Sequence, residues 1–111
     1  MARPNFIELP TRDIAVSQAF YESVFGMNMT SFGPSYACTM TGDVDIGLQA
    51  DQAEASKYPL PVIDVSDLEA TLAAVIAAGV TVTKPIFSFP GGRRFHFLDP
   101  SGNELAAMQQ A

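Results

Sequence analysis

The sequence has little cysteine, and this limits the kinds of site and stabilisation it can contain. Cys38 is the only cysteine of the chain, which excludes an intrachain disulfide and a zinc site built from cysteines. We expect Cys38 to be a small buried apolar residue rather than a nucleophile. A single cysteine fits a reducing compartment, so the sequence predicts a cytoplasmic protein.

Basic residues are also scarce. The 111 residues include 6 Lys and Arg against 12 Asp and Glu, so the formal net charge is −6. Nucleic acids and anionic membranes are bound through clustered Lys and Arg, and we expect neither as a partner. No apolar run reaches the roughly 18 residues of a membrane span. The first ten residues lack the apolar stretch of a signal peptide, and we expect no such leader.

What the chain does have is enough apolar sequence for one core. Hydrophobic residues make up 48% and charged residues 16% of the 111 positions, a balance that argues against disorder. This length suits one domain and is too short for two independent ones. We therefore expect a single domain over residues 1–111.

The order of the elements occurs twice. A strand-like segment, a helix-capping Asp and a terminating Gly are followed by three strand candidates, once with Asp13 and Gly26 and once with Asp67 and Gly79. The two Asp lie 54 residues apart and the two Gly 53, an offset typical of a duplicated unit. The sequence predicts an α+β fold of two βαβββ modules that form a curved mixed sheet with helices on its convex side. The modules span roughly residues 1–55 and 56–111.

The predicted strands alternate apolar and polar residues between turn signals. They cover residues 5–10, 27–32, 36–41, 44–49, 60–65, 80–83, 93–98 and 104–109. Residues 51–58 are polar and rich in alanine, and we interpret them as a linker with a turn of helix.

The segment 87–108 predicts a hairpin with ionisable residues on one face. Asp99 opens a turn with the sequence DPSGN. Strand alternation then places Arg94, His96, Glu104 and Ala106 together on the face opposite the apolar residues. We expect a functional site on this face.

Three segments carry a resemblance to a known family. They read FIELPTRDIAVSQAFYESVFGM, VIDVSDLEATLAAVIAAGV and GGRRFHFLDPSGNELA. Together they resemble the vicinal oxygen chelate superfamily, which includes glyoxalase I, extradiol dioxygenases and the bleomycin and fosfomycin resistance proteins. The resemblance implies paired βαβββ modules, a homodimer, and a cavity enclosed by the cupped sheets. In the enzymes of that superfamily, His and Glu hold a divalent metal in the cavity.

The resemblance also locates the metal positions, and here the sequence departs from the pattern. One ligand position lies seven residues before each helix-capping Asp, at Phe6 and Leu60, and another lies seven residues after Asp99, at Ala106. All three residues are apolar and cannot bind a cation. The resemblance therefore implies a member of the bleomycin-resistance type, with no metal and no cofactor, whose partner is a small organic molecule.

We expect the ligand to lie on an apolar floor between polar walls. The predicted ligand-binding residues are Phe6, Glu8, Tyr36, Leu60, Val62, Arg94, His96, Glu104 and Ala106. No spacing ties a Ser or Cys to His96, so we assign no catalytic residue.

Several alternatives stay open. Arg94 could instead pair with Glu104 across the hairpin while His96 donates to a carbonyl. Phe87 and Phe89 could be core residues or could stack on a ligand. A glyoxalase-, lyase- or dioxygenase-like enzyme could use a relocated metal held by His96, Glu8 and Glu104, or His96 as general base. A protein with a vestigial pocket that only interacts with other proteins is the third class.

Overall fold

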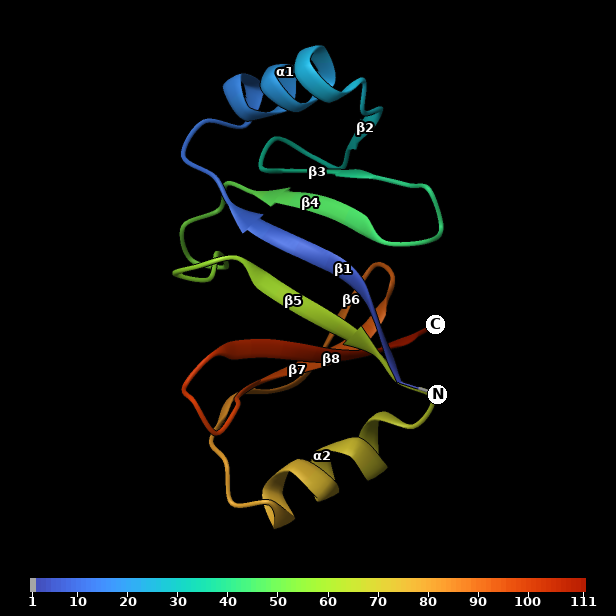
Figure 1. Ribbon diagram of the computed structural model, residues 1–111, viewed down its shortest axis with the longest axis vertical. Coiled ribbons are helices and arrows are strands. Elements are labelled where there is room, and N and C mark those ends of the chain that lie inside the picture. Colours follow the sequence, from blue (N-terminus) through green and yellow to red (C-terminus); the bar gives the residue numbers. More distant parts are fainter. Residues whose placement is uncertain (1) are drawn as a thin grey trace. The chain divides into compact units, whose positions relative to one another are not determined.

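The computed structural model describes residues 2–111. The chain forms two compact units, one of residues 6–60 and one of residues 61–111 with the first residues up to Asn5. We call them the N-terminal and the C-terminal module, and describe each by itself (Figure 1).

The N-terminal module has the order strand, helix and three strands. Its elements are β1 (Arg3–Pro10), α1 (Ile14–Phe25), β2 (Met29–Ser31), β3 (Tyr36–Thr39) and β4 (Asp45–Gln49). The strands lie in the order β2-β3-β4-β1. β1 runs parallel to β4, whereas β2, β3 and β4 pair antiparallel.

The C-terminal module repeats this order. Its elements are β5 (Leu60–Asp64), α2 (Leu68–Ala77), β6 (Val82–Phe89), β7 (Gly92–Leu98) and β8 (Glu104–Gln110). The strands lie in the order β5-β8-β7-β6, with β5 parallel to β8 and the other pairs antiparallel. The predicted α+β fold of two βαβββ modules with mixed sheets is confirmed.

Both helices begin and end where the sequence predicts. The Asp13 carboxylate accepts a hydrogen bond from the Val16 backbone N–H at 3.2 Å, and Asp67 does the same for Ala70 at 3.0 Å. Such caps satisfy N–H groups that have no partner within the helix. Gly26 follows α1 with a φ of 68°, a left-handed conformation that favours glycine.

The core of the C-terminal module lies between α2 and the sheet. Leu68, Phe95 and Ala107 are buried there. Residues packed against them include Val65, Leu72, Val75, Val82, Ile86 and Phe97. Ile76, near the end of α2, lies outside this core and is 60% exposed.

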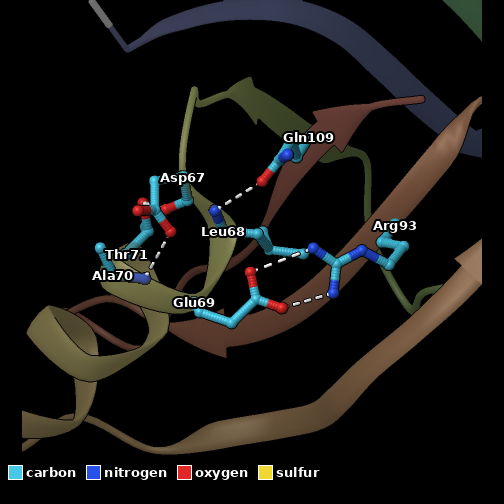
Figure 2. Close-up of polar contacts among 7 residues, drawn as sticks. All are labelled: Asp67, Leu68, Glu69, Ala70, Thr71, Arg93 and Gln109. Atoms are coloured by element: carbon cyan, nitrogen blue, oxygen red, sulfur yellow. Dashed lines mark hydrogen bonds and ion pairs between the residues drawn. The ribbon is translucent and has the colours of Figure 1, made fainter.

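Two polar contacts fix the N-terminus of α2 to the face of the C-terminal sheet that this helix covers, here called the outer face (Figure 2). The Gln109 side-chain oxygen accepts a hydrogen bond from the Leu68 N–H at 2.8 Å. Arg93 donates through both terminal nitrogens to the Glu69 carboxylate, with Nη2 3.0 Å from Oε1. Arg93 and Gln109 are opposite each other on β7 and β8. This pair of neighbouring positions therefore contacts the first two residues of α2, Leu68 and Glu69.

The N-terminal helix is less buried. α1 contacts β3 and β4, but none of its residues is buried. Val16, Phe20 and Val24 follow at helical spacing and are each at least half exposed, at 66%, 50% and 59%. Within the described residues, neither helix is long and apolar enough to cross a membrane.

Two strands differ from their predicted limits by more than the others do. β2 is confined to Met29–Ser31, and β6 runs from Val82 to Phe89 rather than ending at residue 83. The pairing of β6 with β7 shifts register on both sides of Lys84. Pro85 lies within the second shift, where a residue without an N–H interrupts the regular ladder.

Candidate functional site

The face of the C-terminal sheet opposite α2, here called the inner face, carries the predicted ionisable residues. Arg94 and His96 flank Phe95 on β7, and Phe95 is a core residue under α2. Neighbours along a strand point to opposite faces, so Arg94 and His96 share the inner face. His96 is directly opposite Ala106 on β8, and Glu104 lies two residues before Ala106 on the same face.

His96 is the most constrained of these residues. Its side chain is fully buried, with a relative exposure of 0%. Nδ1 lies 3.3 Å from Oε2 of Glu104, and the Thr83 hydroxyl donates to the same oxygen at 2.9 Å. Nε2 is buried and, among the described residues, has no hydrogen-bond partner. The inner face therefore contains a buried imidazole that is held on one side only.

Burial keeps this imidazole neutral. Burial, with a smaller effect of the positive charges of Arg94 and Lys84, lowers the pKa of His96 from 6.5 to about 4, against the opposing effect of Glu104. A carboxylate can only accept hydrogen bonds. The neutral ring therefore donates to Glu104 through Nδ1–H, and Nε2 carries a lone pair.

Aromatic rings of β6 line the same face. The Arg94 guanidinium carbon lies 5.3 Å from the Phe87 ring centre and 5.4 Å from that of Phe89. The Phe87 and His96 ring centres are 5.7 Å apart. These distances suit cation–π contacts and aromatic packing. The cationic and aromatic groups therefore lie next to the ring of His96.

One of the alternative interpretations, the pairing of Arg94 with Glu104, is wrong. Arg94 is opposite Met108, and Glu104 is opposite Leu98, so the hairpin does not align the two charges across the strands. The Nδ1 of His96 faces a carboxylate rather than a carbonyl. Phe87 and Phe89, for which core packing and ligand stacking were both open, do not belong to the cluster around Leu68 and Phe95. They are half-buried and contact Arg94 instead.

In the N-terminal module, two aromatic side chains lie close against Gly47 on β4. Glu8 is buried and lies opposite Gly47 on β4. A Cβ added to Gly47 would lie 2.6 Å from the Phe6 ring and 2.5 Å from the Tyr36 hydroxyl. Real Cβ atoms do not approach this closely, so the two aromatic side chains occupy their positions only because residue 47 is glycine.

The remaining predicted residues are apolar and buried. Val62 on β5 is opposite Ala106 on β8, and Leu60, Val62 and Ala106 are at most 3% exposed. A surface hollow of about 550 Å³ lies elsewhere, in the N-terminal module. It is lined by Gly26, Met27, Asn28, Thr30, Thr39, Met40, Thr41, Val44 and Ile46. None of the predicted site residues contributes to it.

Sequence reasoning missed three contributors. Thr83 was assigned only to a strand, and its contact with Glu104 depends on the irregular pairing of β6. Lys84 lies opposite His96 for the same reason. Gly47 did carry a signal, because an isolated glycine within a strand indicates a close approach of another group.

Nearly the whole chain matches one protein family. The family model described as Glyoxalase/Bleomycin resistance protein/Dioxygenase superfamily covers residues 3–107. The chain belongs to this superfamily. A comparison with curated protein sequences finds no match.

Solved structures of other superfamily members have the same fold. A glyoxalase/bleomycin resistance protein/dioxygenase superfamily member from Vibrio splendidus 12B01 is 22% identical, with a TM-score of 0.70 and complete coverage of both chains. Methylmalonyl-CoA epimerase from Mycobacterium tuberculosis is 15% identical, with a TM-score of 0.76 and coverage of 97% of this chain and 87% of that one. A Mn(II)-bound glyoxalase from Novosphingobium aromaticivorans is 19% identical, with a TM-score of 0.72 and coverage of 98% and 40%. At these identities the likeness concerns the fold alone.

This superfamily member does not have the metal ligands that the family pattern implies. The strand register adds a fourth position to the three at which the family pattern places metal ligands, Phe6, Leu60 and Ala106. Ala106 is opposite Val62, two residues after Leu60, and Gly47 is opposite Glu8, two residues after Phe6. Gly47 thus matches Ala106. None of the four side chains has a donor atom, so these positions do not fit a metal ion. Among the described residues, no group of three or more His, Cys, Asp or Glu could hold one.

Proposed function

We propose that this superfamily member binds a small organic molecule on the inner face of its C-terminal module, without a metal ion at the positions of Phe6, Leu60 and Ala106. The observation that carries the proposal is the buried Nε2 of His96, which has no partner among the described residues. A buried polar atom left without a hydrogen bond is costly. A ligand that donates to this nitrogen would remove that cost.

The state of His96 favours binding over acid–base catalysis. A general base works best when its pKa lies near the operating pH, whereas burial lowers the pKa of His96 to about 4. At neutral pH the ring accepts a hydrogen bond well but takes up a proton poorly. This behaviour is that of a group that orients a ligand.

The kind of superfamily member follows from the same residues. The family includes enzymes and bleomycin resistance proteins. Apolar residues at the four matched positions favour the second kind, which holds its ligand through hydrogen bonds and packing. Arg94, which lies at cation–π distance from Phe87 and Phe89, supplies a cationic group for such packing.

The proposal is tested by ligand-induced thermal shifts after dialysis against EDTA. We expect at least one member of a panel of antibiotics and aromatic metabolites to raise the melting temperature. Arg94→Ala should abolish this shift. Arg93→Ala is the matched control, because Arg93 is the neighbouring arginine on the outer face and contacts Glu69; it should keep the shift. A uniformly flat panel would contradict ligand binding and favour a protein that only interacts with other proteins.

A metal-dependent enzyme is the second candidate, and one observation favours it. A histidine that donates through Nδ1 to a carboxylate and leaves Nε2 open is also the usual arrangement of a metal-binding histidine. His96 and Glu104 provide this pair, but the expected relocated site with Glu8 as third donor is wrong, because no group of three such residues in the described part of the chain could hold a metal. Metal analysis of the purified protein separates the candidates. Stoichiometric zinc, manganese, iron or nickel that is lost in His96→Ala and Glu104→Ala would overturn our proposal.

A further inference from the structure

The contact between Glu104 and His96 determines which ring nitrogen carries the hydrogen. Oε2 of Glu104 accepts from the Thr83 hydroxyl at 2.9 Å and faces Nδ1 of His96 at 3.3 Å. Both groups present a hydrogen to an ionised oxygen, which has no hydrogen of its own to offer. The buried ring is therefore held as the Nδ1–H tautomer, and its open nitrogen is an acceptor.

We propose, on the basis of the function proposed above, that Glu104 is a positioning residue that makes the site select ligands with a hydrogen-bond donor. The ligand class is a planar aromatic compound with a hydroxyl or N–H group, such as a phenol or an N–H heterocycle. Analogues that can only accept a hydrogen bond are rejected, because they leave the lone pair of His96 Nε2 buried without a partner.

The aromatic and cationic neighbours of the His96 ring favour a planar ligand. The Phe87 ring centre is 5.7 Å from that of His96 and 5.3 Å from the Arg94 guanidinium carbon. A flat ring that donates to Nε2 would therefore pack against aromatic and cationic groups that already neighbour His96. The charged groups that act on His96 from its neighbouring strands are Arg94 on β7, Lys84 on β6 and Glu104 on β8.

Paired probes that differ by one methyl group test the selection. We would titrate the wild-type protein with phenol and anisole, and with indole and 1-methylindole, following the ¹⁵N resonances of the imidazole. His96 is the only histidine, so these resonances need no assignment. We expect the unmethylated member of each pair to bind about tenfold more tightly or better, and its binding to shift Nε2 more than Nδ1. Equal affinities within each pair, or an Nε2–H tautomer in the free protein, would overturn the inference.

Replacement of Glu104 tests its positioning role. The amide of Glu104→Gln can donate to Nδ1, which allows the Nε2–H tautomer. We expect the imidazole resonances to show this change and the preference for phenol over anisole to fall by at least half. Glu69→Gln is the matched control, since it makes the same change on the outer face at the contact with Arg93; it should alter neither reading. An unchanged tautomer and preference in folded Glu104→Gln would contradict the role, and if this variant does not fold, the wild-type titrations decide.

The outcomes separate the two proposals. If methylated and unmethylated probes bind equally, the selection fails while small-molecule binding stands. If none of the four probes binds and the wider ligand panel is also flat, both proposals are wrong.

Discussion

The Phe6 ring occupies the space into which a side chain at Gly47 would project. A Cβ at Gly47 would lie 2.6 Å from two carbon atoms of that ring, although the two residues are 41 positions apart in the sequence. Gly47 matches Ala106 of the repeated module, a position at which the family pattern places a metal ligand. Residue 47 has no side chain at this position, and the ring of Phe6 occupies the space instead.

This close contact predicts a large effect of one methyl group. We expect Gly47→Ala to lower the free energy of unfolding by about 1–3 kcal/mol, as overpacking does in cores. Elsewhere in a strand the same change would be neutral or stabilising. Phe6→Leu combined with Gly47→Ala should recover part of the loss, because leucine leaves room for the methyl group. Urea denaturation of the two single variants and the double variant measures the coupling; additive effects would show that the ring and residue 47 do not compete for space.

The lowered pKa of His96 predicts that stability rises with pH in a defined range. Between about 4 and 6.5 the unfolded chain binds a proton that the folded chain does not, so unfolding becomes easier as the pH falls through this range. We expect a loss of about 2 kcal/mol from pH 7 to pH 5 that is absent in His96→Gln.

The same pKa can be measured directly. NMR titration of the single histidine should give a value well below 6.5. A pKa at or above 6.5 would contradict both the burial of the ring and the proposed state of the site.

The contacts at the N-terminus of α2 predict two effects of unequal size. Gln109→Ala removes the acceptor of the Leu68 N–H and should cost about 1 kcal/mol of unfolding free energy. Arg93→Ala should cost less, and its effect should shrink in high salt because the pair is exposed. Arg12→Ala, an exposed arginine before α1, is the matched control for the charge. Urea denaturation at low and high salt makes the comparison.

The pair of Arg93 and Glu69 also has a defined pH dependence. The hydrogen bond from Arg93 holds the pKa of Glu69 below 4.5. The contribution of the Arg93–Glu69 pair to the free energy of unfolding is therefore present above pH 4.5 and is lost as the pH falls through the lowered pKa of Glu69. The wild type and Glu69→Gln should converge in stability at acidic pH; a constant difference would rule out the ion pair.

The lone cysteine is predicted to be unreactive in the folded protein. Burial raises the pKa of the Cys38 thiol, and the nearby charge of Asp45 raises it further, which leaves little thiolate at neutral pH. We expect alkylation by iodoacetamide at pH 7.5 to be about tenfold slower or more in the folded chain than in urea. Equal rates in the two states would show that the thiol is exposed.

Local chemistry was readable from the sequence because it depends on neighbouring residues. Asp13 and Asp67 cap their helices, and Asp99 accepts from the N–H groups of Ser101 and Asn103 in the predicted turn. Each contact joins residues two to four positions apart. The alternation that placed Arg94, His96 and Glu104 on one face is equally local, since it needs only a regular strand.

The sequence did not predict contacts that depend on how two strands pair. Phe87 and Phe89 have the composition of core residues, yet the register of β6 against β7 places them beside Arg94. The contact of Thr83 with Glu104 also requires that register, with its shifts around Pro85. Such shifts depend on how two strands pair across many residues, which alternation in one strand does not encode.

The sequence by itself determined the repeated βαβββ order, the helix caps, the turn at Asp99 and the apolar residues at three of the four matched positions, because these depend on residue type and spacing. Only the tertiary structure decided that Glu104 holds His96 on one side, that Nε2 is left without a partner among the described residues, and that Gly47 makes room for Phe6. These relationships join strands brought together by folding, and the distances between them are set by pairing and packing.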